Sequence, residues 1–293
     1  MLWTLLTLCA FTFGGFSGSK CSSWVGGIAA NRWRITLSLP IMIMLSLVAG
    51  GPFLFPTAWL FFISGILHIG IGDTFLYTGY NRIGPRLTML IALCSSPIFS
   101  WSIEVIFLRS SPGAKELAAA AVIICGVVIA LAPAEKKQFS VRQWRSGIAV
   151  SILAGTFMSI SAVLTRYAMH QTHARGIEVP LIVSALYRVA GGTLFLLIAG
   201  ATVLPKSWSV ASRHRGRFAA WLTASVIIGP VLGMAAYHEA LERQPSAVVQ
   251  AVLSMMPVVV IPIAWIVNKD RPGPRTIAGA LLSAGACAAL VLM

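Results

Sequence analysis

The residues of this sequence that could bind a ligand or transfer a proton are the ionisable and polar ones inside long apolar stretches. The clearest is Glu104, in the apolar stretch around Pro97. Pro97, Trp101 and Glu104 are spaced i, i+4, i+7 and therefore share one helix face. An acid there can bind a proton or a cationic group, because a charge in an apolar helix is costly without a cavity or partner. The alternative is that Glu104, near the end of its helix, reaches an aqueous interface.

Other polar residues fall on two further apolar stretches. Asp73 and Tyr77 are spaced i, i+4 on one predicted helix, which also carries His68. Tyr237 and His238 lie near the end of another. Histidine next to an acid can relay protons. The alternatives are that the two tyrosines only pack and that His238 belongs to a helix end at the lipid headgroups.

Gln250 shares a helix face with Pro257, as Glu104 does with Pro97. The residue equivalent to Glu104 is Ala264, so only one of the two faces carries an acid. The candidates for substrate binding or coupling are therefore Glu104, Trp101, Asp73, Tyr77, His68, Tyr237, His238 and Gln250. Pro97 and Pro257 are assigned a structural role.

Catalytic signatures are missing from the sequence. The run from His238 to Glu242 has glutamate where a zinc-binding HExxH motif needs its second histidine. The pair Gly70 and Gly72 lacks the third glycine of a dinucleotide fingerprint, and neither GxSxG nor a Walker lysine is present. The five cysteines form no CxxC pair. We expect no catalytic site, no metal and no cofactor.

The composition indicates that these residues lie in membrane helices. Of 293 residues, 57% are hydrophobic and 10% charged, and the mean hydropathy is +0.85. The apolar residues form long runs without strand-like alternation, which predicts an all-α polytopic membrane protein. The net charge of +14 comes from Lys and Arg between the runs, where they indicate topology and lipid contacts rather than nucleic acid.

About ten runs are long enough to span a bilayer, which needs ~20 residues. The first is favoured as a membrane helix over a signal peptide because it lacks a positive n-region. The predicted spans are Leu2–Ser22, Arg34–Gly51, Ala58–Tyr80, Arg86–Leu108, Glu116–Pro133, Gly147–His170, Val179–Leu204, Phe218–Leu241, Pro245–Val267 and Thr276–Met293.

The sequence repeats itself at an offset of 160 residues. Matching prolines are the strongest evidence for the repeat, since each proline marks a helix start or a kink. We infer two five-helix repeats, residues 1–133 and 147–293, joined by a basic linker at 134–146. Because five is odd, the repeats are inverted, which places a cavity between them. The matching pairs are Tyr77 with Tyr237, Pro85 with Pro245, Pro97 with Pro257, and Pro112-Gly113 with Pro272-Gly273.

The charges also predict an orientation. Most Lys and Arg, including Arg32 and Arg34, fall at one set of alternate connections, which the positive-inside rule assigns to the cytoplasm. Both termini are then expected outside. The opposite side has only Arg109, Lys115, Arg166, Arg175, Arg188 and Arg243.

The repeated pattern resembles the EamA module of the drug/metabolite transporter superfamily. Pro97 and Pro257 match the module's proline, and Asp270 falls at its acidic position, where the first half has Ser110. Further matches are the small-residue helix Ala278–Gly285, the arginines at Arg32–Arg34 and Tyr187-Arg188, and a degraded first-helix motif at Thr12–Lys20.

The resemblance implies a secondary transporter that exports or exchanges small metabolites, such as amino acids or related compounds, by alternating access. Its partners would be a small-molecule substrate and membrane lipids, with proton coupling as one option, in a bacterial inner membrane. The alternative is a membrane-embedded enzyme or accessory subunit acting on lipid-linked substrates. A channel would show rings of like side chains, and none is visible.

Overall fold

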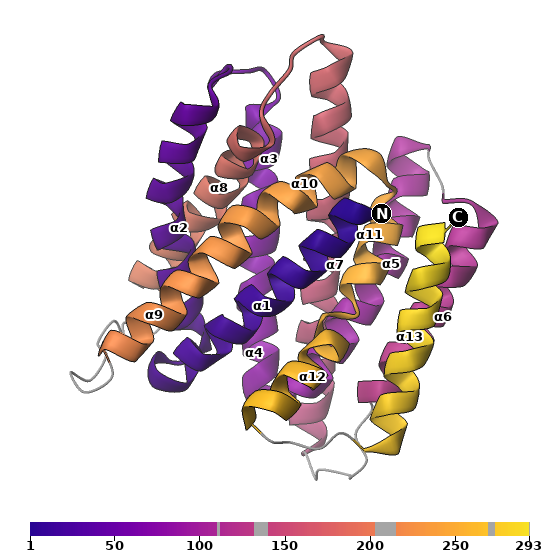
Figure 1. The fold of residues 1–293 in the computed structure, drawn as a ribbon. Helices are drawn as coiled ribbons and strands as arrows, with labels where there is room; N and C mark the ends of the chain where they lie inside the picture. Colours follow the sequence, from indigo (N-terminus) through magenta and orange to yellow (C-terminus); the bar gives the residue numbers. More distant parts are fainter. Residues whose placement is uncertain (110–111, 132–139, 203–214, 269–272, 293) are drawn as a thin grey trace.

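The computed structural model describes residues 1–109, 112–131, 140–202, 215–268 and 273–292. These residues form a bundle of helices, and none of them belongs to a strand (Figure 1). Within these described ranges, seven helices are long and apolar enough to cross a membrane, and Ser246–Pro262 is a shorter apolar one. The predicted all-α, multi-pass membrane architecture is confirmed.

The helices of the first half correspond to the first five predicted spans. The third span is one continuous rod in which a π-helix joins two α-helices. The elements are α1 (Leu2–Val25), α2 (Gly27–Ala49), α3 (Ala58–Gly65), η1 (Ile66–Gly72), α4 (Asp73–Ile83), α5 (Pro85–Leu108) and α6 (Ala114–Leu131).

The second half repeats this order. Its third rod again contains a π-helix, and its fourth helix is interrupted at Ser254 and Met255, just before Pro257. The elements are α7 (Val141–Ala174), α8 (Leu181–Thr202), α9 (Arg215–Val226), η3 (Ile227–Gly233), α10 (Met234–Arg243), α11 (Ser246–Leu253), α12 (Met256–Asn268) and α13 (Pro274–Leu292).

The α6–α13 contact shows how the two halves are oriented. Ser283 donates to the carbonyl of Ile123 at 3.1 Å, and Thr276 donates to the carbonyl of Ala130 at 3.3 Å. Residue numbers rise along one helix as they fall along the other, so the helices are antiparallel, as an inverted pair requires. Small residues permit the approach, since a Cβ on Gly126 would lie 2.8 Å from the Ser283 nitrogen.

Two glycines set the corners at one end of the bundle. Gly26 joins α1 to α2 with φ of 82°, and Gly84 joins α4 to α5 with φ of 83°. Residues with a Cβ atom rarely adopt a positive φ, whereas glycine adopts it without steric cost. Pro85 then occupies the first turn of α5, where its missing N–H costs nothing.

The predicted linker, residues 134–146, overlaps the start of α7. The side chain of Ser140 accepts a hydrogen bond from the Gln143 nitrogen, and the Gln143 side chain accepts one from the Ser140 nitrogen. This capping box starts α7 at Val141, so residues 141–146 are helical despite their charge. Residues 134–139 lie outside the described residues, and the predicted domain boundaries stay a prediction.

Candidate functional site

A central cavity of about 370 Å³ lies between the two halves. Its first-half walls come from α1, α2, η1, α4 and α5, and its second-half walls come from η3, α10, α11 and α12 with Met158 of α7. The cavity is thus where the inverted-repeat prediction places it.

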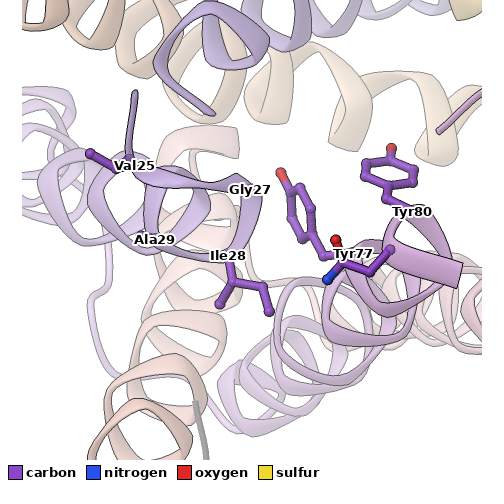
Figure 2. A pocket seen from close by; sticks show the side chains of 7 residues that line it. Val25, Gly27, Ile28, Ala29, Tyr77 and Tyr80 are labelled. Carbon is purple, nitrogen blue, oxygen red and sulfur yellow. The ribbon is translucent and has the colours of Figure 1, made fainter. Parts of the chain in front are cut away.

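The cavity lies toward the end of the bundle that carries the Gly26 and Gly84 corners. Its lining includes Ser22 near the end of α1, Tyr80 near the end of α4 and Pro85 at the start of α5. A smaller pocket of about 200 Å³ adjoins it, between the start of α2 and the end of α4. Figure 2 shows that pocket, where Tyr77 and Tyr80 also line the central cavity and stand opposite Gly27 and Ile28.

A chain of polar contacts runs along the first-half wall. Arg34 of α2 donates from NH2 to the Asn31 side-chain oxygen at 2.8 Å. Asn31 donates in turn to a carboxylate oxygen of Asp73 at 3.0 Å. All three residues line the cavity. Among the described residues, Arg34 and Asp73 make no direct ion pair, so Asn31 links this cation and this anion.

A second polar cluster closes the inner end of the cavity. Gln250 of α11 donates to the hydroxyl of Tyr237 at 3.0 Å. Arg188 of α8 lies behind this pair with its guanidinium carbon 4.9 Å from the Tyr237 ring centre. It donates to Thr165 at 2.8 Å and to Nδ1 of His68 at 2.7 Å. Arg188 is wholly buried, so these contacts replace its hydration.

Five of the eight predicted candidates come together in the cavity wall. His68, on η1, and Asp73 and Tyr77, on α4, line it from the first half. Tyr237, on α10, and Gln250, on α11, line it from the second. The structure places these five side chains around one space, although they are far apart in the sequence.

Two other candidates lie away from the cavity. His238 is wholly buried behind the wall, where its Nδ1 is 2.8 Å from the Ser184 hydroxyl and its ring stacks on Phe61. Trp101 is 40% exposed on the outside of α5 and is not among the lining residues. His238 directly follows Tyr237 in α10, so rotation about the helix axis decides which of the two side chains faces the cavity.

Glu104 is not where the sequence predicted it. It lies about 16 Å of helix rise beyond Leu93, the last α5 residue in the cavity wall. It is wholly buried, so neither the cavity wall nor an aqueous interface describes its place. Its carboxylate accepts hydrogen bonds from the Ser246 nitrogen at 3.0 Å and the Ser246 hydroxyl at 2.8 Å, and lies 3.1 Å from NH1 of Arg166.

Asn31, Arg34 and Arg188 were missed as site residues. Arg34 was interpreted as a cytoplasmic surface charge and Arg188 as one on the opposite side, and the structure overturns both. The available signal was the position of Arg188 inside an apolar run, whereas Asn31 and Arg34 stand before and at the start of a predicted span. Without these two arginines, the side assigned to the cytoplasm still has more Lys and Arg than the opposite side. Asp270 and Ser110, the other family positions, lie outside the described residues.

The comparisons with known proteins agree with this architecture. The model of the EamA-like transporter family matches residues 1–132 and 145–292. A solved structure described as "Crystal structure of protein" superposes with a TM-score of 0.79 at 17% sequence identity. It covers 99% of this chain and 96% of its own, which establishes a shared fold. No curated protein matches the sequence.

Together the helical bundle and its central cavity define a multi-pass membrane protein of the transporter type. The chain belongs to the EamA-like transporter family, since the family model covers nearly its whole length in two segments. Proteins of this family are transporters of the drug/metabolite transporter superfamily. The predicted family is therefore confirmed.

Proposed function

We propose that this protein is a secondary transporter that exports or exchanges small metabolites, such as amino acids or related compounds, by alternating access. The observation that carries the proposal is the cavity between the inverted halves, which lies toward one end of the bundle. A site between two such repeats can open to either side as they rock. We also propose that the membrane is the bacterial inner membrane.

Contacts between the halves hold the opposite end of the bundle closed. The hydroxyls of Thr57 and Thr172 lie 2.5 Å apart, and both side chains are buried. The Tyr187 hydroxyl donates to the carbonyl of Phe53 at 2.5 Å. Each contact joins a first-half residue to a second-half residue. These contacts must separate before the cavity can open at that end.

Glu104 belongs to this closed end and not to the substrate site. Its ion pair with Arg166 and its bonds to Ser246 tie α5 of the first half to α7 and α11 of the second. A proton on the carboxylate would remove the charge that both partners stabilise. Proton coupling, if this transporter uses it, would then act through the closed end, by releasing the tie between the halves.

The charge distribution supports a direction for the open end. The corners at Gly26 and Gly84 belong to the side rich in Lys and Arg, which the positive-inside rule places in the cytoplasm. The cavity would then face the cytoplasm, ready to receive a metabolite for export. The neighbouring exposed arginines Arg215 and Arg217, at the start of α9, belong to the same side.

A membrane enzyme remains the competing class, and no specific contact favours it. Within the described part of the chain, no three His, Cys, Asp or Glu side chains group as metal ligands would. Chemical change of the substrate would distinguish this class from transport, in which the substrate emerges unaltered.

Uptake into vesicles tests the proposal. Purified protein is reconstituted in liposomes, and labelled candidate metabolites are supplied with and without a proton gradient. We expect protein-dependent accumulation of at least one unaltered compound. If no compound accumulates or exchanges under either condition, or if the label is recovered only in a chemically changed product, the proposal fails.

A further inference from the structure

The central cavity contains more positive than negative charge. Arg34 lines it, and Arg188 contacts two of its lining residues, His68 and Tyr237. Asp73 is the acid in its wall. Among the described residues, neither arginine lies within ion-pair distance of a carboxylate. With each group in its ordinary ionised form, the cluster keeps one uncompensated positive charge.

An uncompensated cation inside a membrane protein is costly and marks a functional site. The Nε atoms of both arginines are buried without a hydrogen-bond partner among the described residues. Arg34 has one hydrogen bond to a side chain, the neutral amide of Asn31. A ligand that brings a negative charge would satisfy both deficits, of charge and of hydrogen bonding.

Arg34 is placed to meet such a ligand. It extends from α2 of the first half toward η3 of the second, with NH1 4.0 Å from the point that a Cβ on Gly229 would occupy. A guanidinium presents its N–H groups as a planar fork that fits the two oxygens of a carboxylate. Because Nδ1 of His68 accepts from Arg188, the proton of that imidazole is on Nε2, which adds a neutral donor to the wall.

Most of the remaining wall is apolar. The side chains that provide it include Phe11, Phe16, Leu93, Met158, Met234 and Val260. Aromatic and methionine side chains suit a flat or flexible hydrocarbon group, and methionine adapts to several shapes. The cavity of about 370 Å³ has the size and mixed polarity of a small-molecule site.

We infer that the substrate is a small organic monoanion, with a carboxylate held by Arg34 and an apolar body held by the aromatic and methionine wall. The inference rests on the proposed transport function and narrows its substrates from amino acids and related compounds to those that carry a net negative charge. A cationic amine is disfavoured because Asp73, the acid in the wall, already accepts from Asn31. A monoanion neutralises the cluster, whereas a zwitterion leaves its excess charge in place.

The monoanion inference is tested by measuring how tightly four related small molecules bind to the purified full-length protein. The probes share one apolar body: 3-phenylpropionate, its neutral amide, the cationic 3-phenylpropylamine and the zwitterion phenylalanine. We expect the acid to bind roughly tenfold or more tightly than the amide, as a charged hydrogen-bonded pair commonly provides. We expect the amine to bind most weakly.

Variants of Arg34 locate the effect. Arg34→Gln should weaken binding of the acid roughly tenfold or more while leaving the amide unchanged, and Arg34→Lys should retain part of the preference. Loss of both ligands in Arg34→Gln would point to a merely structural role and contradict the assignment. Arg215→Gln is the control, since it removes the same charge from an exposed position at the start of α9.

Exchange across vesicles separates this inference from the proposed function. Wild-type vesicles that exchange labelled 3-phenylpropionate support both. Exchange of the amide or amine in preference to the acid leaves transport intact and overturns the monoanion class. Failure of the wild type to bind the acid overturns it as well, and tighter binding of phenylalanine replaces it with a zwitterion. Acid binding with the expected pattern but no exchange supports the anion site and contradicts transport.

Discussion

The carboxylate of Glu104 caps the first turn of α11 by accepting hydrogen bonds from both the backbone nitrogen and the hydroxyl of Ser246. Glu104 belongs to the first half of the molecule and Ser246 to the second, and Arg166 of α7 completes the cluster. A carboxylate is favoured at a helix N-terminus, where free N–H groups and the helix dipole meet it. A polar residue that the sequence suggested for the cavity therefore holds two halves together instead.

Glu104→Gln tests that role. The amide keeps the shape of the side chain but removes its charge, so we expect normal insertion and a loss of unfolding free energy of about 2 kcal/mol, typical of a lost charged hydrogen bond. If Glu104 is the coupling group, transport also loses its pH dependence. Thermal unfolding and pH-dependent vesicle uptake measure the two effects.

Glu178→Gln is the matched control, because Glu178 is exposed between α7 and α8. It should change neither stability nor uptake. If Glu104→Gln also leaves the melting temperature, the transport rate and its pH dependence unchanged, then the buried cluster contributes neither to closure nor to coupling.

Gly14 and Gly15 of α1 are expected to respond differently to the same substitution. A Cβ on Gly14 would lie 2.7 Å from Cα of Gly229 in η3, whereas one on Gly15 would meet nothing within 4 Å. Gly14→Ala must therefore push α1 from the second half and should destabilise by roughly 1–3 kcal/mol, the usual range for overpacking. Gly15→Ala should fold like the wild type.

Expression, melting temperature and monodispersity of the two variants in detergent provide the comparison. Equal stability of Gly14→Ala and Gly15→Ala would show that α1 does not approach η3 this closely. Because both variants add one methyl group to neighbouring helix positions, helix propensity cannot account for a difference between them.

The orientation follows from the Lys and Arg count. We expect both termini to face away from the cytoplasm. A reporter that is active only in the cytoplasm, fused after Met293, should give no signal, whereas one that is active only outside should give a strong signal. A bright cytoplasmic reporter would reverse the orientation and with it the side on which the cavity opens.

The sequence predicts where the helices are better than it predicts where each side chain lies relative to the cavity. Long apolar runs and paired prolines identify ten helical segments and two repeats, because membrane helices satisfy their own backbone groups and need a continuous apolar surface. Glycines in ILHIGIG and IIGPVLG, and Pro230 in the second, indicate an irregular helix, but they do not predict that the irregularity is a π-helix. Superposition of Pro97 on Pro257 and Tyr77 on Tyr237 stays a prediction.

The candidate site was predictable in part for the same reason. Polar residues inside apolar runs, such as Asp73 and Gln250, are the ones that line the cavity. Arg34 was misassigned because it stands at the start of a predicted span, and α2 begins earlier, at Gly27. Glu104 was misplaced because its partner Ser246 comes from the other half, and the sequence shows no contact between distant segments.

A reversible cross-link across the closed end tests alternating access most directly. The hydroxyls of Thr57 and Thr172 are 2.5 Å apart, close to the ~2.0 Å that separates disulfide sulfurs, so Thr57→Cys with Thr172→Cys should form a disulfide in a background without the native cysteines. The readout is exchange of labelled 3-phenylpropionate, or of the metabolite that the vesicle assay identifies. Each single-cysteine variant serves as the control and should be unaffected by oxidant.

We predict that the oxidised double variant still binds its substrate from the open end but exchanges none, and that reductant restores exchange to the level of the reduced protein. The closed end must separate in every transport cycle, and the disulfide prevents this. Full-rate exchange by protein that is demonstrably cross-linked would contradict the account, because the substrate would then cross without the two halves parting at Thr57 and Thr172.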